Sequence, residues 1–180
     1  QTGHVENLGC PVPHESIYGA CYDPATDSLF FTGWIRGHLY CFRLQERRVH
    51  DLGKVSENNA FRLVRAKDGR IYGSSRTGYL YRVDPKTLRI EDMDFQVPHE
   101  TYDHHCRYNE LSIARTGPDG RLYMAGMYSR DFFALDTGTG KIENLGHYLP
   151  ATRYSPDGRY LAVGADERLG TVLIYSLEHL

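Results

Sequence analysis

Four arginines, widely separated along the chain, stand at matching points of a repeated sequence pattern. They are Arg36, Arg76, Arg130 and Arg168. A guanidinium group is planar and binds a carboxylate or a sulfate through two parallel hydrogen bonds. If the repeats turn about one axis, the four groups surround a single opening and would recognise an acidic ligand. In the alternative interpretation, each arginine pairs with a local acid such as Asp131 or Glu167 and only stabilises its own repeat.

A second set of side chains could move protons beside these cations. His14 and His38 belong to the first repeat, and Tyr108 and Arg130 belong to the third. β-Elimination on a uronic acid needs an arginine to neutralise the carboxylate, a histidine or tyrosine to remove the C5 proton, and another such group to protonate the leaving oxygen. These four residues are therefore a candidate catalytic set for the cleavage of an acidic saccharide.

Loops between the expected strands supply further candidate ligand-binding residues. Trp34, the single tryptophan of the chain, precedes Arg36 in one of them. Asn59 and Arg62 stand in the loop that leads into the second repeat. An aromatic ring with polar neighbours suits the wall of a sugar-binding cleft. We therefore group these three residues with Arg36, Arg76 and Arg168 as the predicted binding surface.

The segment from His99 to Cys106 holds the densest collection of metal-ligand types in the chain. Its candidate ligands are His99, His104, His105 and Cys106. Imidazole and thiolate groups suit zinc or another divalent ion. Adjacent side chains of an extended segment point in opposite directions, so at most some of the four would share one ion. The alternative is a polar surface loop in which the histidines have no common role.

Composition narrows the class of protein and of partner. The chain has 180 residues and a formal net charge of -2, which argues against a nucleic-acid partner because such binding requires a basic face. No apolar run reaches the roughly 20 residues that a membrane helix needs, so we expect no membrane partner. We expect a soluble protein, and the N-terminal Gln1 is compatible with removal of a leader, which favours a secreted or periplasmic location over a cytoplasmic one.

Internal repetition dominates the rest of the sequence. Residues 140–146 (GKIENLG) reappear as residues 3–9 (GHVENLG), with weaker echoes at 48–53 and 89–93. Asp-Gly-Arg occurs at 68–70, 119–121 and 157–159, each time before alternating aromatic and aliphatic residues, and a degenerate copy stands at 23–28. Asp-Gly between such alternations predicts a tight hairpin. Each copy therefore joins two strands.

A third strand follows each hairpin, at 38–42, 79–83, 131–135 and 171–175, and an outer strand with the Glu-Asn-Leu-Gly pattern comes next. Four antiparallel strands in sequence form one blade of a β-propeller. We predict an all-β fold in which residues 1–180 form a single propeller unit. Its four blades would span about 14–57, 58–107, 108–150, and 151–180 completed by 1–13. The chain would either close as a four-blade ring or supply half of a larger ring, completed as a homo-oligomer.

Two stretches resemble known propeller families. Residues 154–163, which contain Ser-Pro-Asp-Gly-Arg, look like the repeat of WD-like, TolB-type propellers. Residues 135–143 are similar to repeats of streptogramin-lyase-like propellers and, loosely, of propeller-fold polysaccharide lyases of the ulvan and oligogalacturonate types. The likeness covers nearly the whole chain and rests on scaffold turns. For function it implies that a His, Tyr and Arg grouping could cleave polysaccharides, as it does in those lyases.

The leading hypothesis is a propeller that binds an acidic oligosaccharide or another anionic ligand at an arginine-lined mouth, and that cleaves the saccharide by β-elimination. One alternative is a non-catalytic propeller that docks a protein or peptide on its broad face. Another is a designed or excised half-propeller that assembles as a dimer and has no activity. Zinc or another divalent metal is the only cofactor that the sequence suggests.

Overall fold

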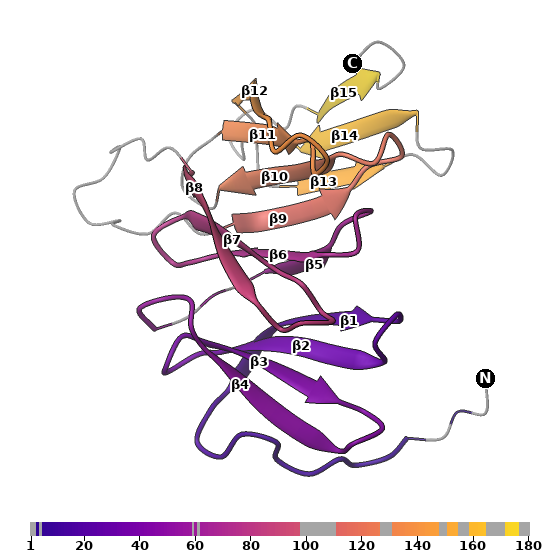
Figure 1. Ribbon diagram of the computed structural model, residues 1–180. Coiled ribbons are helices and arrows are strands. Elements are labelled where there is room, and N and C mark those ends of the chain that lie inside the picture. Colours follow the sequence, from indigo (N-terminus) through magenta and orange to yellow (C-terminus); the bar gives the residue numbers. More distant parts are fainter. Residues whose placement is uncertain are drawn as a thin grey trace.

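The computed structural model describes residues 3, 5–58, 60, 62–97, 111–126, 131–147, 151–154, 159–164 and 172–176 (Figure 1). These residues form fifteen strands and no helix. The strands are β1 (Ile17–Asp23), β2 (Ser28–Gly33), β3 (His38–Arg43), β4 (Arg48–Lys54), β5 (Leu63–Arg65), β6 (Ile71–Ser74), β7 (Tyr79–Val83), β8 (Ile90–Gln96), β9 (Leu111–Thr116), β10 (Leu122–Gly126), β11 (Asp131–Leu135), β12 (Ile142–His147), β13 (Ala151–Tyr154), β14 (Tyr160–Gly164) and β15 (Val172–Ser176). The predicted all-β class is confirmed. None of the described segments forms a helix of the length and apolarity that crossing a membrane requires.

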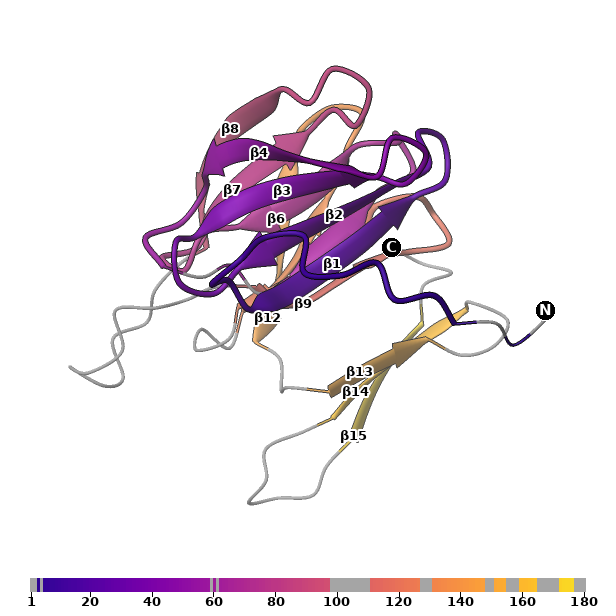
Figure 2. The same cartoon turned by 90° about the horizontal axis from the view of Figure 1, so that it is seen from below.

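Consecutive strands pair antiparallel in four separate sheets. Three sheets have four strands each, β1 to β4, β5 to β8 and β9 to β12, and the fourth contains β13, β14 and β15. Figure 1 shows the sheets following one another as the layers of a fan, with the sheet of β1 to β4 and the sheet of β13 to β15 at opposite ends. Figure 2, seen from below, shows β1 to β4 in front and β13 to β15 set to one side.

Apolar side chains fill the spaces between the first and second sheets and between the second and third sheets. Phe30, Leu39 and Cys41 of the first sheet pack against Ile71 and Val83 of the second. A second cluster joins the second sheet to the third. It contains Ala66, Tyr72, Leu80, Val97, Leu111, Leu122, Met124, Phe133 and Leu135. Because the central strand β10 is buried along its whole length, its residues form an apolar run and do not alternate with polar ones.

Two of the Asp-Gly-Arg turns, at 68–70 and 119–121, form the hairpins that their sequence predicts, and residues 157 and 158 of the third lie outside the described residues. In the turn between β5 and β6, the carboxylate of Asp68 accepts the Arg70 N–H at 3.0 Å, and Gly69 has a φ of +83°. The turn between β9 and β10 repeats the geometry, with Asp119 accepting the Arg121 N–H at 3.1 Å. A positive φ is easily adopted by glycine, which explains the residue at the turn centre.

The Glu-Asn-Leu-Gly pattern encodes a β-bulge in each outer strand. A side-chain oxygen there accepts the backbone N–H two residues later. The pairs are Asp51 with Gly53 at 2.9 Å, Asp92 with Asp94 at 2.9 Å and Asn144 with Gly146 at 2.8 Å. The second member of each pair has a positive φ, and the ladder to the third strand shifts register at the same place. Such a bulge increases the twist of the outer strand.

The N-terminal segment does not form the outer strand that the repeat predicts. Residues 5–10 are in no strand, although Asn7 accepts the Gly9 N–H at 2.8 Å as in the bulges. Glu6 contacts Arg47 in the turn between β3 and β4, and Val12 packs on the outer face of the first sheet. Completion of a last blade by residues 1–13 therefore stays a prediction.

Polar groups tie neighbouring sheets at both ends of the strands. The Thr32 hydroxyl accepts the Gly19 N–H at 3.1 Å and donates to the carbonyl of Ala60, where the chain enters the second sheet. The Ser74 hydroxyl similarly accepts the Leu111 N–H of the third sheet at 2.9 Å. A hydroxyl near the end of a second strand thus fixes the start of the next sheet.

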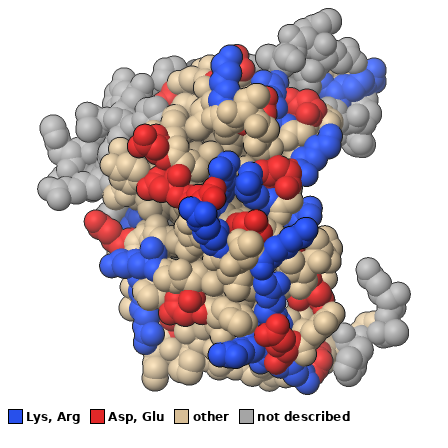
Figure 3. Space-filling view, in the orientation of Figure 1, with Lys and Arg blue, Asp and Glu red and all other residues tan. Residues whose placement is uncertain are grey.

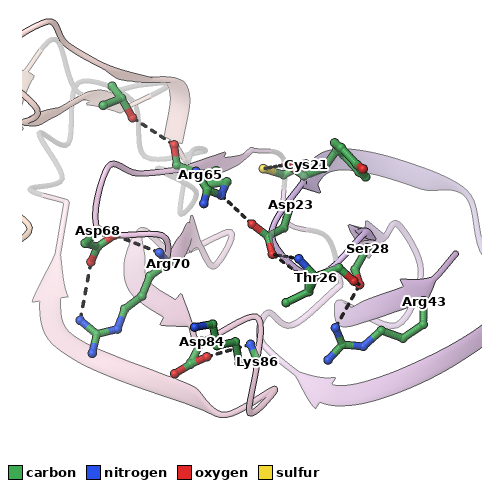
Figure 4. A network of polar contacts seen from close by, with 12 residues as sticks. Cys21, Asp23, Thr26, Ser28, Arg43, Arg65, Asp68, Arg70, Asp84 and Lys86 are labelled. Carbon is green, nitrogen blue, oxygen red and sulfur yellow. Dashed lines mark hydrogen bonds and ion pairs between the residues drawn. The ribbon is translucent and has the colours of Figure 1, made fainter. Parts of the chain in front are cut away.

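A buried ion pair joins the first and second sheets at the opposite end of the strands (Figure 4). The side chain of Asp23 is fully buried, and its carboxylate accepts the Arg65 Nε–H at 2.6 Å and two hydrogen bonds from Thr26. Burial would raise the pKa of Asp23, but the hydrogen bonds from Thr26 and Arg65 and the charge of Arg65 outweigh it, so the pKa lies below its ordinary value.

We expect Arg65→Met to lower the free energy of unfolding by about 2 to 3 kcal/mol, because it leaves the Asp23 carboxylate buried without its cation. The effect should be smaller than for a fully buried pair, since 34% of the Arg65 side chain is exposed. Asp23 is ionised and stabilising above about pH 4, and this contribution is lost as the pH falls through its depressed pKa. The free energies of unfolding of the unaltered protein and of Arg65→Met, measured with denaturant, should therefore differ less at pH 3 than at pH 7.

The matched control is Arg70→Met, which removes a more exposed arginine 3.6 Å from Asp68. It should cost less than about 1 kcal/mol, as for other surface ion pairs. Equal losses in the two variants would show that the Asp23 contact does not tie the sheets together.

Candidate functional site

The strands end on two opposite faces of the fan, which carry different kinds of residues. The hairpin end contains the tight turns between first and second strands. The loop end contains the connections from second to third strands and from each sheet to the next, including residues 34–37, 55–58 and 75–78. The predicted ligand-binding residues that the structure describes all lie at or beside the loop end.

Glu15 organises the loop that carries Arg36. Its side chain is only 1% exposed, and its carboxylate accepts the backbone N–H groups of Ile35 at 2.9 Å and Arg36 at 3.1 Å. A Cβ atom at Gly33 would lie 2.7 Å from this carboxylate, so any other residue there would displace the Glu15 side chain. The buried Glu15 carboxylate thus takes the place of strand-to-strand hydrogen bonds at the start of the loop and sets the conformation of the loop.

The guanidinium group of Arg36 lies near Glu15, and more than half of the Arg36 side chain is exposed. Its Nε lies 3.9 Å from Glu15 Oε1, while 56% of the side chain remains exposed. The alternative interpretation, in which each arginine pairs with a local acid, therefore applies to Arg36. The acid is Glu15, which was not one of the two examples given from the sequence. One carboxylate contact still leaves guanidinium donors directed to solvent, because the group has five N–H donors.

Ser56 joins the first and second sheets between Arg36 and Arg76. Its N–H donates to the carbonyl of Gly37 at 3.0 Å, and its hydroxyl accepts the Arg76 N–H at 2.8 Å. Gly37 has a φ of +67°, and a Cβ atom there would lie 2.2 Å from the Ser56 carbonyl oxygen. The backbone positions of the two arginines are therefore fixed relative to each other at the same end of the fold.

His38 forms a hydrogen-bonded pair with Asp51 across β3 and β4. The Nδ1 atom of His38 lies 2.9 Å and 3.0 Å from the two carboxylate oxygens of Asp51. A carboxylate at Nδ1 favours the tautomer in which Nδ1 carries the proton and Nε2 can accept one. His38 follows Arg36 after a single residue, so a potential base stands beside a potential anion-binding group.

Tyr40 lies behind this pair and is held neutral. Its ring stacks on that of His38 with 6.1 Å between the centroids, and its hydroxyl donates to Glu15 at 3.4 Å. Burial, followed by the negative charge of Glu15, raises the pKa of Tyr40 to about 12. Tyr40 therefore remains protonated at neutral pH and acts here as a hydrogen-bond donor.

Trp34 forms an aromatic surface on the same loop. Its ring centroid lies 4.7 Å from that of Tyr18 with the planes tilted by 49°. The two residues are 44% and 49% exposed, and Ile17 and Ile35 beside them are also exposed. An exposed apolar group of this kind suits contact with a ligand or with another protein surface.

The hairpin end offers two shallow pockets whose charges are largely compensated. One of about 350 Å³ is lined by Ala25, Arg65, Asp68, Gly69, Arg70, Asp84, Pro85 and Lys86. The other, of about 340 Å³, is lined by Lys67, Asp68, Asp119, Gly120, Arg121, Asp136, Thr137 and Gly138. Figure 4 shows the cations of the first pocket beside carboxylates. Figure 3 likewise shows positive and negative side chains interspersed on the visible face, so it presents no patch of a single sign.

The structure brings together part of the predicted site. Arg36, His38 and Trp34 belong to one loop and strand, and Arg76 is tied to them through Ser56. His14 is exposed beside Glu15 with a φ of +64°, and Arg62 is exposed just before β5. The remaining candidates lie outside the described residues. They are Asn59, Tyr108, Arg130, Arg168, His99, His104, His105 and Cys106.

Two residues that the sequence analysis did not select are part of the site. Glu15 forms the base of the Arg36 loop, and Asp51 orients His38. The signal for Asp51 was its place in the bulge pattern, where it has a structural role in binding the Gly53 N–H. The described residues contain no group of three or more His, Cys, Asp or Glu side chains that could hold a metal ion. The predicted zinc site remains untested, because its ligands are not among them.

Comparison with known proteins identifies a family and a fold. The family described as Domain of unknown function (DUF5074) matches residues 43–156. No curated protein matches the sequence. Many solved structures share the fold, and three of them illustrate the range of their functions.

An extracellular domain assigned to a one component system of B. thetaiotaomicron has a TM-score of 0.68 at 16% identity, over 92% of this chain and 21% of that one. Virginiamycin B lyase from Staphylococcus aureus has a TM-score of 0.62 at 13% identity, over 90% and 56%. Regucalcin, a calcium-binding protein from Agrobacterium tumefaciens, has a TM-score of 0.63 at 17% identity, over 95% and 57%. The chain thus spans between about a fifth and three fifths of the length of these structures.

These likenesses confirm the propeller-type fold and the predicted resemblance to streptogramin-lyase-like propellers. Identities this low show the fold alone. These structures do not show the predicted resemblance to polysaccharide lyases, which stays a prediction.

We expect Glu15→Gln to loosen the loop at residues 34–37, because one of the two carboxylate acceptors becomes an N–H₂ donor facing backbone N–H groups. Amide hydrogen exchange measured by NMR should be about 10-fold faster at Ile35 and Arg36, corresponding to the loss of roughly one hydrogen bond. Glu57→Gln, at an exposed position of the neighbouring loop, should leave both amides unchanged. Unchanged exchange in the Glu15 variant would exclude the organising role.

Proposed function

This chain belongs to the family described as Domain of unknown function (DUF5074), and we propose that it binds an acidic saccharide at the loop end of its propeller-type fold. One observation carries the proposal. Ser56 and Glu15 hold the backbones of Arg36 and Arg76 at the same end of two neighbouring sheets, and more than half of the Arg36 side chain is exposed. Preorganised arginines bind carboxylates well because little side-chain freedom is lost on binding.

The surroundings of Arg36 favour a saccharide over a simple anion. Trp34 and Tyr18 present exposed rings beside the guanidinium group. The apolar faces of a sugar ring can pack on such aromatic surfaces while its carboxylate pairs with the arginine. In this proposal Arg76, Arg130 and Arg168 bind further acidic groups along the chain of sugars, and Asn59 and Arg62 contact them from the connecting loop.

The charges at the hairpin end make it the weaker candidate. Its carboxylates accept hydrogen bonds from its own arginines or backbone, as Asp119 does from Arg121 at 2.6 Å and Asp84 from the Lys86 N–H at 2.8 Å. An acidic ligand would have to compete with these carboxylates. At Arg36 the nearest acid is already buried and occupied by backbone donors.

A second candidate function is cleavage of the saccharide by β-elimination, which the His38 and Asp51 pair favours. Asp51 at Nδ1 would leave Nε2 of His38 to remove the C5 proton, while Arg36 neutralises the carboxylate as charge develops. The electron pair of the broken C–H bond forms the double bond, and the leaving oxygen departs from C4. His14 or Tyr108 would protonate that oxygen.

Assembly and location follow as parts of the same proposal. The four sheets would be four consecutive blades, at about 14–57, 58–107, 108–150, and 151–180 with 1–13, in a ring of four or as half of a larger ring. An extracellular neighbour supports a secreted or periplasmic location, where polysaccharides are accessible. A divalent metal at His99, His104, His105 or Cys106 stays a separate prediction.

We expect Arg36→Ala to weaken binding of a galacturonate oligosaccharide about 10- to 100-fold, because it removes a charge-assisted contact. Isothermal titration calorimetry at low and at physiological salt measures the loss. The methyl-esterified oligosaccharide should bind the unaltered protein weakly, since it lacks the carboxylate. Arg48→Ala, at an exposed position of β4, is the matched control and should bind normally. Equal affinity of the Arg36 and Arg48 variants would refute the site.

If the protein is a lyase, His38→Gln should abolish the unsaturated product, followed by its near-ultraviolet absorbance, while leaving oligosaccharide affinity within about 2-fold. Asp51→Asn should also slow the reaction, because the amide favours the wrong tautomer of His38. His50→Gln is the control, since His50 also lies near a carboxylate, 3.5 Å from Glu46, but near the hairpin end. If the unaltered protein binds the oligosaccharide but forms no unsaturated product, the elimination reaction is refuted and only the binding function remains.

A further inference from the structure

The loops that carry Arg36 and Arg76 meet at a single residue, Ser56. The Ser56 N–H donates to the carbonyl of Gly37 at 3.0 Å, and the Ser56 hydroxyl accepts the Arg76 N–H at 2.8 Å. The two arginines belong to separate sheets, and sheets that pack face to face lie about 10 Å apart. Their backbones are therefore fixed at roughly the distance between the sheets, about 10 Å.

This separation restricts how a saccharide can contact both arginines. The Arg36 side chain has limited freedom to move toward the second sheet, because its Nε lies 3.9 Å from the buried Glu15 carboxylate. A span of about 10 Å is longer than one sugar residue of a polysaccharide. Carboxylates that bind to both arginines would therefore belong to sugars that are not directly linked, with one further sugar between them.

Glu57 stands in the connection between the two arginine loops. It follows the bridging residue Ser56 directly, and it is exposed. Among the residues that the structure describes, none forms an ion pair or a hydrogen bond with the Glu57 carboxylate. The acid beside Arg36 is Glu15 instead. Glu57 thus places a negative charge between two cations without neutralising either of them.

A carboxylate in this place discriminates between acidic and neutral sugars. It repels another carboxylate, and it accepts hydrogen bonds from hydroxyl and amide groups. A uronate as the middle sugar would meet the charge of Glu57, whereas a neutral sugar would offer donors to it. Like charges brought together reject the wrong ligand and leave binding of the right one unaffected.

Each arginine loop also has an exposed aromatic residue. Trp34, which is 44% exposed, precedes Arg36 by two positions, and Tyr79, which is 49% exposed, follows Arg76 at the start of β7. The Tyr79 backbone is fixed, because its N–H donates to the Ser75 hydroxyl at 3.0 Å. Aromatic rings can pack against the apolar faces of sugars. Both loops therefore offer surfaces for sugars of one ligand that extends across the two sheets.

We propose that the loop end selects a saccharide in which acidic and neutral sugars alternate, and that Glu57 determines this specificity. The inference rests on the proposed binding of an acidic saccharide. Arg36 and Arg76 bind the carboxylates of two acidic sugars, and Glu57 accepts hydrogen bonds from the neutral sugar between them. The selection holds whether or not the saccharide is cleaved.

Isothermal titration calorimetry with two hexasaccharides tests the selection. In a hyaluronan hexasaccharide, glucuronate alternates with N-acetylglucosamine, whereas every sugar of hexagalacturonate is acidic. The unaltered protein should bind the hyaluronan fragment about 10-fold more tightly, although hexagalacturonate carries more carboxylates. In Glu57→Gln the preference should fall to about 2-fold or less, through tighter binding of hexagalacturonate. High salt should also reduce the preference, because it screens the repulsion.

Glu46→Gln is the matched control, because it removes the same charge from a side chain that is 58% exposed near the hairpin end. It should leave both affinities unchanged. Equal affinities in the unaltered protein, tighter binding of hexagalacturonate, or a preference that persists in Glu57→Gln would overturn the selection and leave the Arg36-dependent binding of an acidic saccharide intact. If neither saccharide binds, the proposed function itself is refuted, and the selection with it.

Discussion

The packing of one sheet on the next is the constraint on which the rest of the structure depends. Each central sheet has two apolar faces, and both must be covered. Leu122 and Leu135 of the third sheet therefore pack against the second, as Ile71 and Val83 of the second pack against the first. Because twisted sheets stacked in this way rotate relative to one another, a chain of hairpins becomes a fan.

The same constraint explains what happens at the first sheet. Its outer face carries Phe31, Tyr40 and Phe42, which are nearly fully buried although no further sheet of the described chain covers them. Val12 and other partly buried side chains around the cluster cover it instead. Aromatic residues toward the inner edge, Tyr18 and Tyr22, remain about half exposed. Between the other described sheets, an apolar face of this kind packs against the neighbouring sheet.

Polar contacts add alignment to this packing. Hydroxyl groups near the ends of second strands bind the backbone of the next sheet, and the Asp23 and Arg65 pair joins the sheets at the other end. At the loop end such contacts also bear on the proposed binding site, because Ser56 and Glu15 bind the backbones of arginines from separate sheets. In that proposal, the contacts that align the sheets also position the binding residues. Relatives with the same fold and different functions fit this division between scaffold and loops.

Local features of the fold could be predicted from the sequence because each of them depends on consecutive residues. Asp-Gly-Arg contains both the carboxylate that accepts the turn N–H and the glycine that adopts a positive φ, so the hairpins at 68–70 and 119–121 were predictable. The repeat also predicted that Arg36 and Arg76 occupy equivalent loops. Only the tertiary structure placed Glu15 beneath Arg36, twenty residues from the Ile35 N–H that it accepts, and paired His38 with Asp51. These contacts depend on strand register, on bulges that shift it, and on the angle between sheets, and no short run of residues encodes those quantities.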